Sequence, residues 1–227
     1  MPDVLLHQWE ISPFCRKVRK VLALKGVAYR TEEYNGLKAR NAAGLSAAGK
    51  LPVLDYDGER VQDSSAICDF LERKHPSPSL LPAEPQEKAL ALVLEDWADE
   101  SLYFLEIYLR FEIPEVRPKA IDLLCAGRPG WERAIFGAVL PPRMRKKLRA
   151  QGTGKLTREQ VEKAFLDHLD RVDALLGRTG WLVGSACTIA DIAVGAQLAE
   201  VRRTSHLAPR MDERPRVVEW LARLPEG

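Results

Sequence analysis

Residues 12–26 read SPFCRKVRKVLALKG, and this stretch predicts one complete helix. Serine followed by proline is a typical helix start, with the serine as the cap and the proline in the first turn. Apolar side chains then recur at the spacing of one helix face, at Phe14, Val18, Val21 and Leu22. Gly26 suits the position just beyond the last turn, where a left-handed backbone is common.

Strand and helix signals alternate on both sides of this helix. Val4–Gln8 is a short apolar run suited to a buried strand, and Ala28–Glu33 predicts a second one. Leu37–Leu45 follows as a weak helix. Leu51–Tyr56 predicts a strand that turns back at Asp57-Gly58.

A helix capped by Ser64 and stopped by His75-Pro76 completes this part of the chain. The resulting order is β-α-β-α-β-β-α. A hairpin combined with crossover units in so short a span predicts an α/β, thioredoxin-like domain over residues 1–76.

Residues 77–86 are rich in proline and serine and are expected to form a linker. Residues 87–227 show no convincing strand, so an all-α helical-bundle domain is expected there. Four apolar helix faces support it, within Leu90–Tyr108, Val161–Leu176, Ile189–Ala199 and Val217–Leu224.

Residues 113–156 are the least regular part of the second domain, with five prolines. We expect helices near Arg117–Leu124 and Trp131–Val139, and the rest is interpreted as an excursion over the bundle. The basic run from Arg143 to Arg149 has two interpretations. It contacts an anionic partner, or it is a solvated helix face, which is the commoner use of such a run.

Composition excludes several classes of protein. The 227 residues are 46% hydrophobic and carry a formal net charge of +2, too small to indicate nucleic acid or an acidic membrane as partner. The start of the chain lacks the pattern of a signal peptide, and no apolar run is long enough to span a bilayer, so we expect a soluble, cytoplasmic protein.

The cysteines and histidines are too scattered for a metal site or a disulfide framework. Cys68, Cys125 and Cys187 lie among apolar residues and are interpreted as core side chains.

The first candidate site is the helix start at Ser12-Pro13-Phe14-Cys15. Free backbone amides and the helix dipole favour an anion there, and a thiolate beside such an end has a lowered pKa. Ser12 can donate a hydrogen bond to that thiolate. The alternative is that Ser12 only caps the helix and Cys15 is only a buried thiol.

Two further segments complete the candidate site. A cis bond before Pro52, at the start of a strand, would leave the N–H and C=O of Leu51 free to pair with an extended peptide. Farther on, the helix start at Ser64 can hold a carboxylate, and Asp63 can hold an ammonium group. Alone, this second segment is also compatible with an ordinary capping turn.

These motifs together resemble the glutathione S-transferase family. The matching segments are SPFCRKVRKVLALKG, GKLPVL, VQDSSAICDFLERKHP and GWLVGSACTIADIAVGAQL. The last contains Thr188-Ile189-Ala190-Asp191, which is similar to the family's capping box. The first resembles omega-like and soluble prostaglandin E synthase-like members, with Ser12 in place of the first cysteine of their Cys-Pro-Phe-Cys.

The resemblance implies glutathione as co-substrate and assigns its contacts. It places the cysteinyl part at Leu51 and Pro52, the γ-glutamyl end at Asp63 and Ser64, and the glycyl carboxylate near Lys50. It also implies a homodimer and a role in detoxification.

Ser12 decides the expected chemistry. A serine cannot form a mixed disulfide, but its hydroxyl can hold the thiolate of glutathione. We therefore expect Ser12 to be catalytic, in a transferase that joins glutathione to a hydrophobic electrophile. Phe14, Tyr103 and Tyr108 are the expected electrophile contacts. Three alternatives stay open: a glutathione-binding scaffold without catalysis, a thiol–disulfide reductase that uses Cys15, and an isomerase.

Overall fold

The strand predicted at Val4–Gln8 is present as β1, inside a four-stranded sheet. The computed structural model describes residues 2–227. In the sheet, β1 pairs in parallel with β2 (Arg30–Glu33) and antiparallel with β3 (Val53–Tyr56), which pairs antiparallel with β4 (Glu59–Gln62). The strand order is β2-β1-β3-β4.

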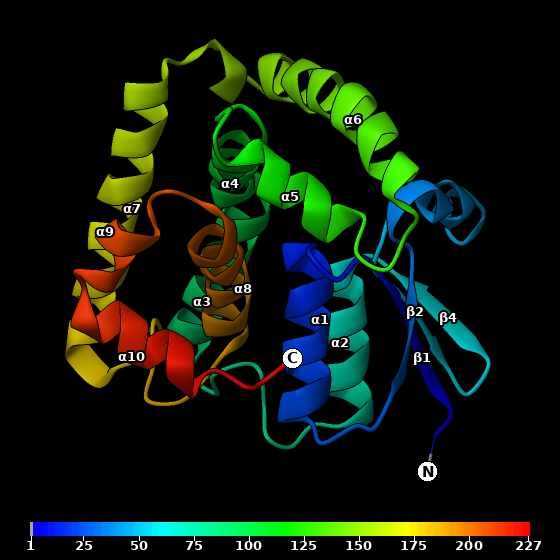
Figure 1. Cartoon of the computed structure of the whole chain (residues 1–227). Helices are drawn as coiled ribbons and strands as arrows, with labels where there is room; N and C mark the ends of the chain where they lie inside the picture. The colour runs from blue at the N-terminus through cyan, green and yellow to red at the C-terminus, as the bar shows by residue number, and fades with distance from the viewer. Residues whose placement is uncertain (1) are drawn as a thin grey trace.

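Two helices pack side by side against one face of this sheet (Figure 1). The helix predicted from residues 12–26 is α1 (Pro13–Leu24), and its partner is α2 (Ser64–Lys74). The apolar face of α1 is in the core, with Val18, Val21 and Leu22 fully buried. Burying side chains of this size stabilises the fold by about 1.5–3 kcal/mol each.

Two elements in this part are present but differ in detail from the prediction. The weak helix expected at Leu37–Leu45 is instead the 3-10 helix η1 (Gly36–Gly44), of which only Gly36 and Ala42 are buried. With so few buried contacts and two glycines, nothing favours a full α-helix. Strand β2 also begins at Arg30, two residues later than expected.

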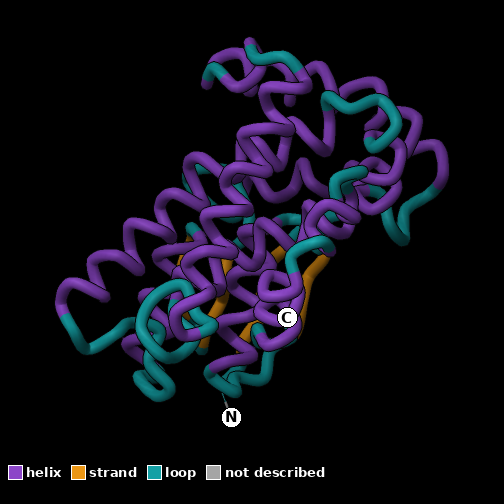
Figure 2. The backbone as a smooth tube through the Cα atoms, turned by 90° about the vertical axis from the view of Figure 1, so that its left-hand side faces the viewer, coloured by secondary structure: helices purple, strands orange, loops and turns teal. Residues whose placement is uncertain are grey.

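The rest of the chain is helical, and Figure 2 shows the strands gathered in one part of the molecule. This confirms the predicted fold class. None of the helices within residues 2–227 has the length and apolar content needed to cross a bilayer. The elements are α3 (Pro85–Trp97), η2 (Ala98–Leu102), α4 (Tyr103–Phe111), α5 (Arg117–Leu124), α6 (Gly130–Gln151), η3 (Thr153–Lys155), α7 (Arg158–Thr179), α8 (Ile189–Thr204), α9 (Ala208–Asp212) and α10 (Pro215–Arg223).

The long helix expected around Leu90–Tyr108 contains an irregular turn. Its first part, α3, passes through one π-helical turn, η2, into α4. Single π-helical turns inside longer helices often occur at functional sites. Here the turn contains Asp99, and Tyr103 follows it directly.

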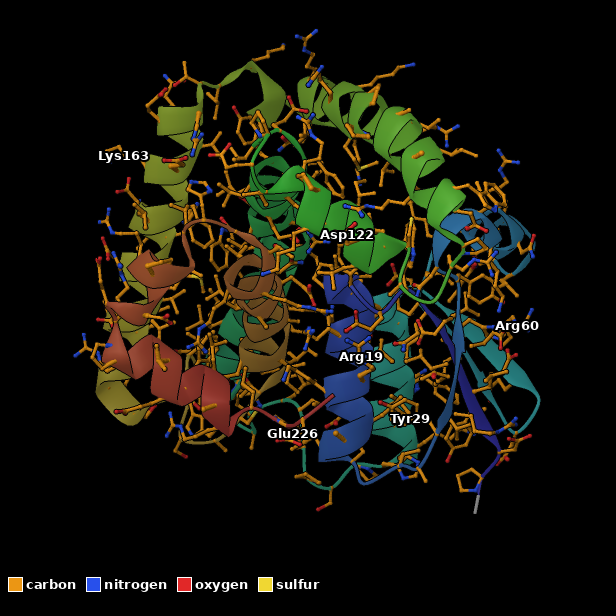
Figure 3. All side chains as sticks on the ribbon, viewed as in Figure 1. Arg19, Tyr29, Arg60, Asp122, Lys163 and Glu226 are labelled. Atoms are coloured by element: carbon orange, nitrogen blue, oxygen red, sulfur yellow. The ribbon has the colours of Figure 1, made fainter. Side chains whose placement is uncertain are left out.

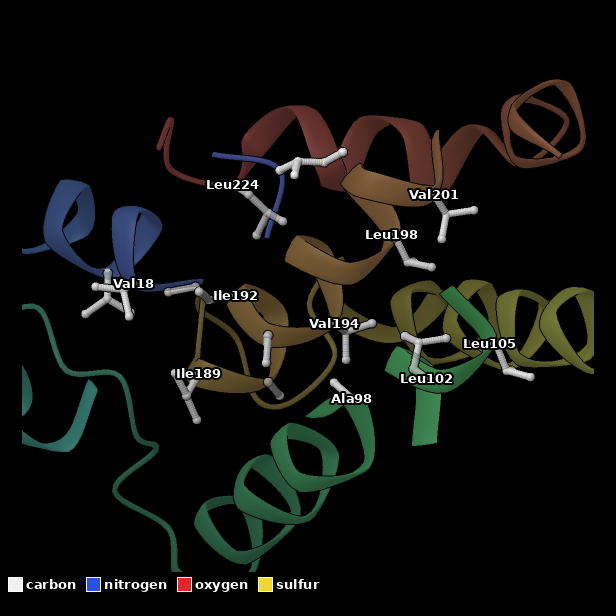
Figure 4. Close-up of a cluster of buried hydrophobic side chains, with 14 of the residues drawn as sticks. Val18, Ala98, Leu102, Leu105, Ile189, Ile192, Val194, Leu198, Val201 and Leu224 are labelled. Atoms are coloured by element: carbon white, nitrogen blue, oxygen red, sulfur yellow. The ribbon is translucent and has the colours of Figure 1, made fainter. Parts of the chain in front are cut away.

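Helix α8 lies at the centre of the second domain, and almost all of it is buried. Figure 4 shows its apolar side chains between α1, the long helix and the C-terminal segment. The predicted capping box is present at its start. The buried carboxylate of Asp191 accepts hydrogen bonds from the Thr188 N–H at 2.9 Å and the Thr188 hydroxyl at 2.8 Å.

The excursion between α4 and α7 contains more helix than predicted. Helix α5 matches the expected Arg117–Leu124, but α6 continues through Pro141-Pro142 to Gln151 and includes the whole basic run. One side of α6 packs inward through residues four apart, a spacing that the prolines had obscured: Glu132, Phe136, Leu140, Met144 and Leu148.

Candidate functional site

Three predicted site segments meet at one edge of the sheet because of its register. His7 near the end of β1 is paired with Val53 at the start of β3, and Val53 is paired with Gln62 at the end of β4. The loop to Ser12 leaves β1 at this edge, Pro52 enters β3 there, and Asp63 follows β4. The fold therefore collects the three segments that are far apart in the sequence.

Ser12 caps α1 with an extended backbone. Its Oγ accepts the Cys15 N–H at 3.4 Å, a long and weak hydrogen bond. Because the hydroxyl accepts in this contact, its own proton remains available to a nearby anion. The side chain is half-buried, so it combines the helix N-terminus with access from outside.

Cys15 is fully buried, and the Trp9 N–H donates to its Sγ at 3.4 Å. Burial raises the pKa of this thiol to about 11, although the Trp9 N–H and the Ser12 hydroxyl act in the opposite direction. At neutral pH only about one thiol in ten thousand would be ionised at that pKa. Cys15 therefore has the properties of a core side chain.

Replacing Cys15 with alanine is expected to keep turnover within about threefold of the wild type. The thiol is neither exposed nor ionised, so its removal costs packing and little chemistry. Steady-state kinetics with glutathione and an activated aryl chloride would check this. A loss of more than tenfold in a folded variant would restore Cys15 as a catalytic thiol.

The peptide bond between Leu51 and Pro52 is cis. Leu51 precedes β3 and lies outside the ladders of the sheet. Lys50 is exposed, and its N–H lies 3.3 Å from the Ser46 hydroxyl.

Asp63, and not Ser64, is the cap of α2. Its backbone has a φ of 76°, and its Oδ1 accepts the N–H groups of Ser65 at 3.0 Å and Ala66 at 3.2 Å. A carboxylate is a stronger acceptor for these amides than a hydroxyl. Ser64 is the first helical residue and is 4% exposed. The exposed Asp63 carboxylate still has its second oxygen for an ammonium group.

A buried lysine that the sequence analysis missed ties this region to the second domain. The Lys17 ammonium is fully buried and donates to Ser65 Oγ at 3.0 Å and to the Asp99 carboxylate at 2.7 Å, and it also pairs with Glu95. Burial lowers the pKa of Lys17, but Cys68 and the carboxylates of Asp99 and Glu95 raise it by more. The π-helical turn carries Asp99, so this cluster holds α1, α2 and the long helix together.

Arg110 in α4 holds the loop before Ser12 from the other side. Its guanidinium is 5% exposed and donates to the Ile11 carbonyl at 3.2 Å. Arg203 in α8 forms a bidentate ion pair with Glu10 of the same loop, at 2.6 and 2.9 Å. The second domain therefore positions the backbone beside the candidate catalytic serine. Neither arginine belongs to a motif that would have revealed this role.

Of the predicted electrophile contacts, the structure brings together Phe14 and Tyr103. Their ring centroids are 4.6 Å apart in an edge-on arrangement, and Phe104 packs edge-on against Tyr103 at 5.4 Å. Tyr108 does not join them. It is buried, and the charges that act on its hydroxyl include those of Glu112 and, in α7, of Glu159 and Arg158. Because Tyr108 lies five residues after Tyr103 on the same helix, its side chain points about 140° away from that of Tyr103 around the helix axis.

Helix α6 crosses above this region from η1 towards α7 (Figure 1). Its first turn is anchored on the first domain, where the buried Glu132 carboxylate accepts the Leu37 N–H at 2.8 Å. Figure 3 labels Asp122 of α5, whose ion pair with Arg133 ties the two helices together.

Farther along α6, two side chains contact the candidate site. Phe136 packs edge-on against Trp9, with centroids 6.3 Å apart. Lys147 Nζ lies 3.1 Å from the Tyr103 hydroxyl and 4.6 Å from the centre of its ring. The basic run is mostly a solvated face, as the commoner interpretation held, but Lys147 reaches the site.

The fold and the collected segments define a thioredoxin-like domain joined to a helical domain. Two family models match the chain, described as glutathione S-transferase, N-terminal domain, over residues 6–79 and glutathione S-transferase, C-terminal domain, over residues 156–223. The chain belongs to the glutathione S-transferase family. Residues 80–155, which include α3 to α6, lie outside both matches.

Two curated relatives show the range of similarity. A glutathione S-transferase of Pseudomonas putida is 28% identical over 64% of this chain, which spans 56% of that protein, about half its length. The isoprene-epoxide–glutathione S-transferase of Rhodococcus sp. (strain AD45) is 26% identical, with 95% of this chain and 92% of that protein covered.

A solved structure of a glutathione S-transferase from Methylobacterium radiotolerans, in complex with glutathione sulfonate, is also similar. It is 27% identical with a TM-score of 0.63, and the match covers 98% of this chain and 90% of that one.

Proposed function

We propose that this protein is a glutathione transferase. The observation that carries the proposal is the meeting of Ser12, the cis Leu51–Pro52 bond and Asp63 at one edge of the sheet. An extended peptide bound beside Leu51 would have its thiol near Ser12 and its γ-glutamyl ammonium near Asp63. Ser64 and Lys50 are assigned to the γ-glutamyl and glycyl carboxylates. The similar structure that holds glutathione sulfonate supports this arrangement.

In the proposed reaction, bound glutathione loses its thiol proton to water, and Ser12 donates a hydrogen bond to the thiolate. The sulfur then forms a bond to an electrophilic carbon. When the electrophile is an aryl chloride, the carbon–chlorine bond breaks and chloride leaves with the electron pair. When it is an epoxide, the carbon–oxygen bond breaks, and the oxygen takes a proton.

Phe14 and Tyr103 are proposed to contact the electrophile. Burial raises the pKa of Tyr103 to about 12, so its hydroxyl stays protonated at neutral pH and can donate to a substrate oxygen. The Rhodococcus relative, named for an epoxide, supports a hydrophobic electrophile of this kind. The burial of Tyr108 favours a core role for that side chain.

We also propose a cytoplasmic homodimer with one domain over residues 1–76 and the other over residues 87–227. Leu90, Leu92 and Val93 are exposed apolar side chains on α3 and suit a contact between two copies.

Titration with glutathione tests the proposal, and Asp63→Asn is its matched variant. Calorimetry should show binding by the wild type, with thiolate absorbance in the ultraviolet near pH 7. Asp63→Asn retains a capping oxygen but loses the charge opposite the ammonium. We expect it to bind about fivefold more weakly, about 1 kcal/mol.

The protein's own thiols will contribute little to this absorbance because burial raises the pKa of Cys15, Cys68, Cys125 and Cys187. Binding without thiolate absorbance would favour a non-catalytic glutathione-binding protein. Equal affinity in the variant would remove the γ-glutamyl assignment from Asp63.

A further inference from the structure

Lys147 is a cation held at the electrophile side of the site. Its ammonium lies 4.6 Å from the centre of the Tyr103 ring and 5.4 Å from that of Phe104, and it donates to the Tyr103 hydroxyl at 3.1 Å. The Tyr103 ring in turn packs edge-on against Phe14, two residues after Ser12. A chain of direct contacts therefore links Lys147 to the start of α1.

No carboxylate of residues 2–227 pairs with this ammonium. The lysines that form ion pairs there are Lys17, Lys25, Lys38, Lys74 and Lys163. Partial burial lowers the pKa of Lys147, and the positive charge of Lys50 in the first domain lowers it further, with Glu100 opposing. Lys147 and Lys50, one from each domain, thus place two positive charges in this part of the site, against the one negative charge of Glu100.

The helix that carries Lys147 is well placed to set specificity. Helix α6 is anchored through Glu132 to η1 at one end and through the buried Leu148 at the other. Between these anchors, Phe136 packs on Trp9. The backbone that carries Lys147 is therefore held by a helix that contacts both domains, and it belongs to the segment that neither family model matches.

We propose that Lys147 selects aromatic electrophiles that carry a carboxylate. The rings of Phe14 and Tyr103 would contact the aromatic part, and the Lys147 ammonium would pair with the carboxylate. This inference rests on the proposed function. Lys147 could also pair with the glycyl carboxylate of glutathione. The experiment distinguishes the two carboxylates because every glutathione conjugate carries the glycyl one.

The experiment compares S-(4-carboxybenzyl)glutathione with S-benzylglutathione, two conjugates that differ only in the added carboxylate. Their Kd values are measured by calorimetry near neutral pH for the wild type, Lys147→Gln, Lys147→Arg and Lys146→Gln. Lys146 is the control because it is the neighbouring lysine on the same helix and is exposed like Lys147.

We expect the wild type to favour the carboxylated conjugate, and Lys147→Gln to reduce that preference about fivefold, which corresponds to about 1 kcal/mol for an exposed ion pair. Lys147→Arg should keep the preference because it keeps the charge, and Lys146→Gln should not change it. We expect the same pattern in the ratio of kcat/KM for 4-chloro-3,5-dinitrobenzoate to that for its methyl ester. Lys147→Gln should lower this ratio, and Lys147→Arg and Lys146→Gln should keep it.

If both conjugates bind but the preference is the same in Lys147→Gln and wild type, the assignment of Lys147 is wrong while the proposed function stands. Equal weakening of both conjugates by Lys147→Gln would assign Lys147 to glutathione itself and also overturn the proposal. If neither conjugate binds the wild type, the proposed function fails, and the selection of carboxylates fails with it.

Discussion

Replacing Asp191 with alanine is expected to lower the free energy of unfolding by about 3–5 kcal/mol. The carboxylate is fully buried and accepts from the Leu182 N–H at 2.9 Å, both groups of Thr188, and Trp220 Nε1 at 2.9 Å. Alanine would leave four buried donors without an acceptor. These donors join α8 to the loop before it and to α10, so the loss affects the centre of the second domain.

Urea denaturation followed by circular dichroism would measure this loss. Asp167→Ala is a matched control, because its carboxylate pairs with Lys163 on the surface of α7 and should contribute less than about 0.5 kcal/mol. The loss of stability in Asp191→Asn should lie between these two values. The asparagine oxygen can accept hydrogen bonds, but its NH2 group would face other donors. A loss below 1 kcal/mol for Asp191→Ala would contradict the structural role assigned to this carboxylate.

Ser12→Ala is expected to lower kcat at least tenfold, about 1.4 kcal/mol of activation free energy. The variant removes the one hydroxyl that the structure places at the start of α1, and bound glutathione would then hold its thiolate through backbone amides alone. The pH profile should shift in parallel, because a thiolate without this hydrogen bond forms only at higher pH.

Loss of the helix cap is a separate effect of the same substitution and costs about 1 kcal/mol of stability. Ser12→Gly separates the two effects, since glycine is nearly as good a cap but has no hydroxyl, while Ser12→Thr retains both. We therefore expect low activity in the glycine variant and substantial activity in the threonine variant. An unchanged rate in Ser12→Ala would remove Ser12 from the mechanism.

The first domain was predictable because its signals are local. The cap at Ser12, the apolar spacing in α1 and the turn at Asp57-Gly58 each act within a few residues, and the structure contains all three. The cap of α2 was assigned to Ser64 instead of Asp63, because two adjacent capping residues cannot be ranked without knowing the backbone conformation.

The contribution of the second domain to the site was not predictable, because it depends on contacts between distant segments. Lys17 meets Asp99 across 82 residues, and Arg110 reaches Ile11 across 99. The length of α6 was also not predicted from the sequence pattern. Pro141 and Pro142 indicated a break, but the helix continues through them. A basic run does not reveal which of its members lies over an aromatic ring of the site, so Lys147 had no individual signal.

The path of α6 has an evolutionary consequence. The candidate glutathione-binding edge is built from the sheet, whereas the α6 side chains beside it come from a surface segment joined to the bundle at two points, after α4 and before α7. Insertions, deletions and substitutions in such a segment can accumulate while the cap of α8 and the cluster around Lys17 stay unchanged. Descendants of one ancestral gene can thus acquire new substrates by altering a single helix.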